Sequence, residues 1–216
     1  MRRLRYWIAD NFVMMSAILV LLYLFLPVAY TFVFSFNNHG KSNIAWVPEG
    51  SPTLKHWLNP CGPPGLCQSL VNSLQIGALA TLVATVLGSM IAFALVRHNF
   101  FGRGATNTLV FLPMATPEIV LGASLLTIFV QGYYRVGLEL GFWTILIAHI
   151  MFCISFVVVN VKARLLSMDP RLEEAASDLY ADPRTTFWKV TFPLALPGIT
   201  AAALLSFSLS FDDFII

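Results

Sequence analysis

Five long apolar stretches alternate with polar segments along the chain. They cover residues 12–36, 69–96, 108–130, 142–161 and 194–216. A bilayer core of about 30 Å needs roughly 20 helical residues, so each stretch is long enough to span it. None of them alternates between polar and apolar residues as a barrel strand does, and a helix satisfies all its backbone polar groups within lipid. The pattern predicts an all-α, polytopic helix bundle that forms one transmembrane domain over residues 1–216.

The composition agrees with a membrane protein that has little soluble mass. Hydrophobic residues make up 57% of the chain and charged residues 11%, with a mean hydropathy of +0.75. A soluble domain carries about 25% charged residues. The net charge is only +2, and no basic stripe indicates a nucleic-acid partner.

The positions of the basic residues predict the orientation. Of the 13 Lys and Arg residues, ten precede the first stretch or follow the second and the fourth. Because basic residues collect on the cytoplasmic side, the N-terminus is expected to be cytoplasmic. The apolar core of a signal peptide is about 7–15 residues long, and the first apolar stretch is longer, so we expect it to be retained. Five spans put Ile216 outside with no polar segment after it, so at least one further span is expected beyond it.

The three cysteines divide into two groups. Cys61 and Cys67 lie in the first outer loop, where a disulfide is chemically permitted; we expect the disulfide, with two free thiols as the alternative. A metal site is not expected, because this spacing has no suitable His or Cys neighbours. Cys153 lies within the fourth stretch, where it is expected to be a small packing residue.

The polar segment over about residues 169–192 predicts two short helices. Asp169-Pro170 and Asp182-Pro183 are each a capping residue followed by proline at the first helical position. Leu172 and Leu179 share one face of the first helix with the alanines between them. The segment either docks a protein or lies on lipid headgroups. Because the first helix is acidic, anionic lipids would repel it, and protein docking is favoured.

The same segment resembles the EAA loop of binding-protein-dependent ABC importer permeases. Glu174, Ala175 and Ala176 match the start of that motif, and Val190, Phe192 and Pro193 match its later positions. Tyr180 stands where the family pattern has glycine. If that glycine adopts a left-handed turn, tyrosine costs roughly 1 kcal/mol or more there.

The resemblance covers nearly the whole chain and implies a type I importer fold. Segments 72–74, 141–143, 152–159 and 206–214 resemble the spermidine/putrescine branch. The resemblance implies a permease in the bacterial inner membrane with these partners: two ATPase subunits that bind ATP and Mg, a second permease subunit and an extracytoplasmic substrate-binding protein. No cofactor is expected in this chain. The residues expected to couple to the ATPase are Glu173, Glu174, Ala175, Ala176, Leu179, Tyr180 and Pro193.

Three acidic residues lie within the apolar stretches. An acidic residue within a span is costly, which makes Glu118, Asp212 and Asp213 candidates for the substrate pathway. A polycationic substrate would compensate the repulsion between adjacent carboxylates. The alternatives are a solvated Asp pair in the headgroup zone, and a Glu118 that pairs with a helix end created by Pro113 and Pro117. His149 is expected to be packed or hydrogen-bonded.

No arrangement of residues indicates an enzyme, so we expect a non-catalytic membrane subunit of a polyamine importer. Within the same class, the alternative is import of another solute, such as ferric ion, a sugar or thiamine. A secondary transporter driven by an ion gradient would also use intramembrane acids, but it would leave the docking segment without a purpose. A membrane scaffold would need neither feature.

Overall fold

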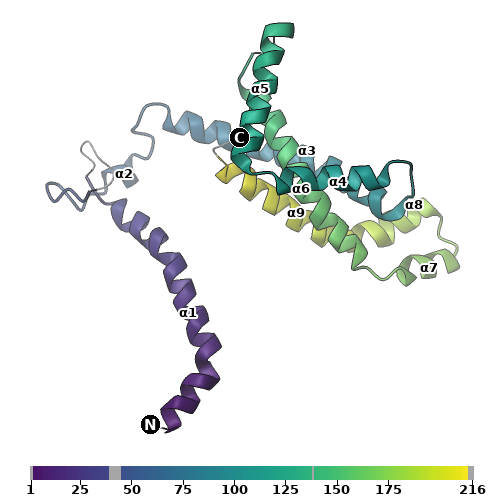
Figure 1. The fold of residues 1–216 in the computed structure, drawn as a ribbon, viewed down its shortest axis with the longest axis horizontal. Helices are drawn as coiled ribbons and strands as arrows, with labels where there is room; N and C mark the ends of the chain where they lie inside the picture. Colours follow the sequence, from purple (N-terminus) through teal and green to yellow (C-terminus); the bar gives the residue numbers. More distant parts are fainter. Residues whose placement is uncertain (1, 39–44, 138, 214–216) are drawn as a thin grey trace. The chain divides into compact units, whose positions relative to one another are not determined.

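A computed structural model describes residues 2–38, 45–137 and 139–213, and in this part of the chain all regular structure is helical (Figure 1). The helices are α1 (Arg2–Phe34), α2 (Lys55–Leu58), α3 (Leu66–Arg97), α4 (Arg103–Ala115), α5 (Glu118–Val136), α6 (Phe142–Leu166), α7 (Arg171–Asp178), α8 (Pro183–Thr186), the π-helical turn η1 (Phe187–Thr191) and α9 (Phe192–Asp212). The predicted all-α class is confirmed. Residues 214–216, at the end of the expected fifth span, lie outside the described residues.

The chain divides into two compact units, Met1–Cys67 and Gln68–Ile216. In the first, the described apolar part of α1 is long enough to cross a membrane and has none of its residues buried. The segment after α1 is organised by Asn37, whose buried amide donates to the Ala45 carbonyl at 3.0 Å and accepts from the Val47 N–H at 2.8 Å. Cys61 and Cys67 form a disulfide with their Cα atoms 5.4 Å apart.

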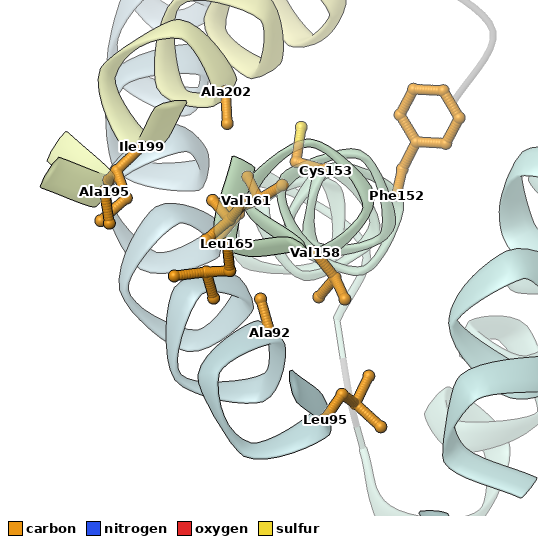
Figure 2. Close-up of a cluster of buried hydrophobic side chains, with 12 residues drawn as sticks. Ala92, Leu95, Phe152, Cys153, Val158, Val161, Leu165, Ala195, Ile199 and Ala202 are labelled. Atoms are coloured by element: carbon orange, nitrogen blue, oxygen red, sulfur yellow. The ribbon is translucent and has the colours of Figure 1, made fainter. Parts of the chain in front are cut away.

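The core of the second unit is built around α6, which packs against α3 and α9 (Figure 2). Alanines of α3 and α9, such as Ala92 and Ala202, face larger side chains of α6. Small residues allow helix backbones to approach closely, which is how helices associate within lipid. A Cβ added at Gly88 would lie 2.7 Å from Val157 of α6, so glycine is required at this crossing.

The third apolar stretch forms two helices instead of one continuous span. α4 and α5 meet at an angle of 108° across Thr116 and Pro117. Proline has no N–H and favours an extended residue before it, and Thr116 has ψ of 133°. Glu118, expected within the third apolar stretch, therefore begins α5 beside a bend. With this bent pair counted as one, five stretches of the described residues can cross a membrane.

The polar segment after α6 continues into α9 without a break. The expected fifth span began at residue 194, whereas the structure joins α8, η1 and α9 into one helical stretch over Pro183–Asp212. Pro193 lies in the first turn of α9, directly after the π-helical turn, where its missing N–H is tolerated. Pro193 and Pro197 therefore both lie within α9.

Candidate functional site

A cavity of about 440 Å³ opens between α3, α6 and α9. It lies at the N-terminal ends of α3 and α6 and at the C-terminal end of α9. We call it the polar cavity, and it is lined by Ser69, Asn72, Ser73, Ile76, Gly141, Phe142, Ile145, His149, Ser210 and Asp213. The lining brings hydroxyl, amide, imidazole and carboxylate groups together at this end of the bundle.

A buried hydrogen bond joins α6 to α9 at the polar cavity. His149 Nδ1 lies 2.9 Å from Ser210 Oγ, and both side chains are almost fully buried. Polar groups within a bundle of membrane helices face its interior and bond to each other, since lipid offers them no partner. His149 is thus hydrogen-bonded, as its sequence context indicated. Asn72 and Ser73 of α3 line the same cavity and add two neutral groups that can donate or accept.

The three acidic candidates occupy different environments. Asp213 lines the polar cavity and is partly buried, whereas Asp212 is exposed at the end of α9 and does not line it. Successive helical residues point about 100° apart, which explains the separation of the pair. Glu118 is exposed at the first turn of α5, where the helix dipole stabilises a negative charge. The structure therefore brings only Asp213 of the three to the polar cavity.

Both Asp-Pro pairs stand at helix starts in the polar segment. The Asp169 carboxylate accepts the Arg171 N–H at 3.0 Å, and Pro170 already has helical dihedral angles. Asp182 is the N-terminal cap of α8 and accepts a hydrogen bond from the Thr185 hydroxyl. This hydrogen bond is the main reason that the pKa of the exposed Asp182 carboxyl is lowered.

Glu173 ties the polar segment to the bundle. Arg97 at the end of α3 forms an ion pair with Glu173 Oε1 at 2.6 Å, and the Thr191 hydroxyl donates to the same oxygen at 2.8 Å. One carboxylate thus joins α7, α3 and η1. The family resemblance placed Glu173 among the residues that couple to a partner, but its ion pair and its hydrogen bond from Thr191 are within this chain. Arg97 and Thr191 were missed, because nothing in the sequence pairs residues so far apart.

Tyr180 closes α7 in a left-handed conformation, with φ of +60°. Its N–H donates to the Ser177 carbonyl at 3.0 Å, and the Ala181 N–H donates to the Ala176 carbonyl at 3.0 Å. This pair of bonds is the Schellman arrangement, whose left-handed position is usually glycine. The tyrosine side chain is 98% exposed, so no packing within the chain offsets the backbone cost.

The surface of the polar segment exposes large apolar side chains. Leu179 is 81% and Trp188 63% exposed, beside Tyr180 and the partly exposed Leu172. Glu174, Ala175 and Pro193 are exposed as well, while Ala176 is half-buried. Next to them a hollow of about 660 Å³, which we call the loop hollow, is lined by Phe93, Arg97, His98, Pro170, Glu173, Glu174, Ser177, Ala181, Pro183, Thr186, Phe187 and Thr191.

Arg164 makes a second contact that the sequence did not reveal. Its guanidinium donates two hydrogen bonds, of 3.0 and 2.8 Å, to the Leu194 carbonyl of α9. A Cβ added at Gly198 would lie 2.5 Å from Arg164 Cβ and Cγ, so the two helices meet here at close range. Among the described residues, no group of three His, Cys, Asp or Glu side chains is placed to hold a metal ion.

Comparison with known proteins places this architecture among transport permeases. Residues 84–216 match the family described as binding-protein-dependent transport system inner membrane component. The spermidine/putrescine transport system permease protein PotC of Escherichia coli K12 is 38% identical over 194 residues, which cover 90% of this chain and 70% of that protein. The putrescine transport system permease protein PotI of the same organism is 34% identical, with coverage of 90% and 69%.

Two solved structures share the fold at lower identity. A chain of a bacterial ABC transporter for the acidic polysaccharide alginate aligns with a TM-score of 0.69 at 16% identity, over 97% of this chain and 77% of that one. A chain of the MetNI methionine ABC transporter in an inward-facing form aligns with a TM-score of 0.57 at 22% identity, over 68% and 69%. The likeness concerns the arrangement of helices.

Proposed function

Because the chain belongs to the family of binding-protein-dependent transport system inner membrane components, we propose that it is the permease subunit of an ATP-driven importer of polyamines such as spermidine or putrescine. The observation that carries the substrate class is the acidic Asp213 in the polar cavity of a chain whose relatives are named as polyamine permeases.

The chemistry of the polar cavity suits a primary ammonium group. Such a group has three donors and one positive charge. The Asp213 carboxylate supplies the opposite charge, and the Asn72 and Ser73 oxygens supply neutral acceptors. The ring of Phe142 offers a face for a cation–π contact. An alkyl diamine also has an apolar body, which suits the Ile76 and Ile145 side chains in the same cavity.

The polar segment suits a docking site for an ATPase. Leu179, Tyr180 and Trp188 are exposed on a segment whose first helix is acidic, and an apolar surface of this kind is typical of a protein contact. We infer that ATP and Mg are bound by that partner, and that this chain is non-catalytic. Glu174, Ala175 and Pro193 are exposed beside these side chains and would complete the contact.

The complete importer would need other chains. Two ATPase subunits, a second permease subunit and an extracytoplasmic binding protein follow from the family's mode of action. The described part of α1 offers a long apolar surface to lipid or to a neighbouring permease. The polar cavity and the loop hollow lie at opposite ends of α3, roughly 36 Å apart for 24 residues of helix. We therefore infer that they face opposite sides of the inner membrane, with the loop hollow and the N-terminus in the cytoplasm.

A solute panel tests this function. The complete complex with its binding protein is reconstituted in proteoliposomes, and ATP hydrolysis and uptake are measured with putrescine, spermidine, a sugar, thiamine and ferric ion. We expect stimulation by the amines. Stimulation by one of the other solutes, with none by either amine, would replace polyamine as the substrate. ATP hydrolysis by this chain purified without its partners would contradict its non-catalytic role.

A further inference from the structure

A second polar pocket lies where α3, α4 and α6 meet, away from the polar cavity, and it shares no lining residue with the loop hollow. It has a volume of about 270 Å³ and is lined by Leu95, Arg103, Gly104, Asn107 and Lys162. We call it the basic pocket. It lies near the C-terminal ends of α3 and α6 and at the start of α4, which is the end of the bundle that carries the polar segment.

The two cations of the basic pocket have only neutral partners. Arg103 donates from Nε to the Leu95 carbonyl at 2.9 Å and from a terminal nitrogen to Asn99 Oδ1 at 2.6 Å. Lys162 donates to Asn107 Oδ1, and its ammonium lies 5.9 Å from the centre of the Phe111 ring. Among the described residues, none of the lining side chains is acidic. Two positive charges thus share one small pocket without a carboxylate.

The hydrogen-bonding capacity of these groups is only partly used. A guanidinium has five N–H donors and an ammonium three. Two donors of Arg103 and one of Lys162 are engaged within the chain. Lys162 is half-buried, whereas Arg103 is exposed at the start of α4, and a charge near the membrane is costly unless it is paired. The basic pocket therefore has the charge and the free donors to bind an oxyanion.

The surroundings of the basic pocket are those of a membrane interface. Phe101, in the turn before Arg103, is fully exposed, and Leu109 and Leu112 of α4 are exposed on one face three residues apart. Lys162 lies one turn before the end of the apolar helix α6. A ligand in the basic pocket would thus have its anionic part at the cations and an apolar surface beside it.

We propose that the basic pocket binds the phosphate of an anionic phospholipid, with the acyl chains along the exposed leucines of α4. Basic pockets between membrane helices on the cytoplasmic side are suited to such headgroups. A free inorganic phosphate would use the same donors, but it would make no use of the adjacent apolar surface. An acidic side chain of a partner protein is the other source of negative charge, and the exposed apolar face of α4 favours lipid over it.

Lipid binding tests this proposal independently of which solute is transported. The complex that contains this chain is placed in bilayers of phosphatidylcholine alone, and acyl-labelled phosphatidylglycerol is titrated in. The variant Arg103→Gln with Lys162→Gln should lose about tenfold or more in affinity. The variant Arg103→Lys with Lys162→Arg keeps both charges and should retain most of the binding. Arg135→Gln removes an exposed charge of α5 that lies outside the basic pocket, so it should bind as the unaltered chain does.

Three results would overturn the lipid proposal. The first is equal phosphatidylglycerol affinity of the neutralised variant and the unaltered chain. The second is binding of inorganic phosphate at the two cations without selective binding of phosphatidylglycerol. The third is loss of a protein partner from the neutralised complex, detected by co-purification, while lipid affinity stays unchanged. Circular dichroism of each variant checks that the helices remain folded, and the charge-keeping variant separates charge from packing.

Discussion

The two ends of the same helix bundle differ in where their polar and apolar side chains lie. At the polar cavity, Asp213, Asn72 and Ser73 line a hollow between three helices. At the loop hollow, Glu173 is held by Arg97 and Thr191, while apolar Leu179 and Trp188 are exposed. One end thus presents polar groups to a space within the protein, and the other uses Glu173 for contacts within the chain while large apolar side chains lie exposed beside it.

This difference fits recognition of a small solute at one end and of a protein partner at the other. A small polar solute is selected by a few positioned donors and acceptors in a cavity. A protein partner is held mainly by exposed aromatic and apolar side chains, with polar groups fixing the shape of the contact surface. We therefore expect substitutions at the polar cavity to change solute recognition, and substitutions in the polar segment to change coupling or stability.

The largest effect is expected from Asp213→Asn. Loss of a charge-assisted hydrogen bond to an ammonium costs about 1.5–3 kcal/mol, so polyamine uptake should fall by about tenfold to a hundredfold. Asp212→Asn is the matched control, because Asp212 is the adjacent carboxylate and lies outside the polar cavity. Uptake is measured in proteoliposomes, and assembly by co-purification. Equal loss in both variants would remove the distinction between the two carboxylates.

The close contact between Arg164 of α6 and Gly198 of α9 is tested by Gly198→Ala. The added Cβ would meet Arg164 at 2.5 Å and displace its bonds to the Leu194 carbonyl. We expect a loss of about 1–3 kcal/mol in unfolding free energy. Gly104→Ala is the control, since nothing lies within 4 Å of the added atom. Denaturant unfolding in detergent measures both, and a Gly198→Ala protein as stable as the control would contradict the close crossing.

In the polar segment, Tyr180→Gly should raise stability while it weakens docking. Removal of a side chain from the left-handed position recovers about 1 kcal/mol. The same change deletes a fully exposed aromatic side chain from the proposed ATPase contact. Thermal unfolding of the chain measures the change in stability, and its affinity for the ATPase subunit measures the change in docking. Tyr180→Ala keeps the strained backbone and is expected to weaken docking without the gain in stability.

The smallest effect is expected at the Arg97–Glu173 pair. Both side chains are more than a quarter exposed, so the pair contributes less than about 1 kcal/mol. Arg97→Glu or Glu173→Arg alone should reduce coupling, measured as stimulation of ATP hydrolysis by the loaded binding protein. The double exchange should restore part of it. If the double exchange is no better than the single changes, the ion pair does not position α7.

The apolar stretches and both Asp-Pro helix starts could be read from the sequence, because length, hydropathy and capping are local properties. The bend at Pro117 was indicated by proline, but its angle depends on how α5 packs against α6. The pairing of Arg97 with Glu173 depends on tertiary contacts. So does the difference between Asp212 and Asp213, since both are acidic and only the rotation of α9 decides which one lines the polar cavity.

The joined stretch α8–η1–α9 runs from the polar segment to the polar cavity. Its 30 residues correspond to roughly 45 Å of helix. Thr191, in the π-helical turn, bonds to Glu173, which also pairs with Arg97 of α3, and Ser210 near the C-terminal end bonds to His149. We therefore expect that a rotation of the whole stretch against α6 would change the His149–Ser210 contact at the polar cavity. The same helical stretch would then connect the segment proposed to dock the ATPase with the cavity proposed to bind the solute.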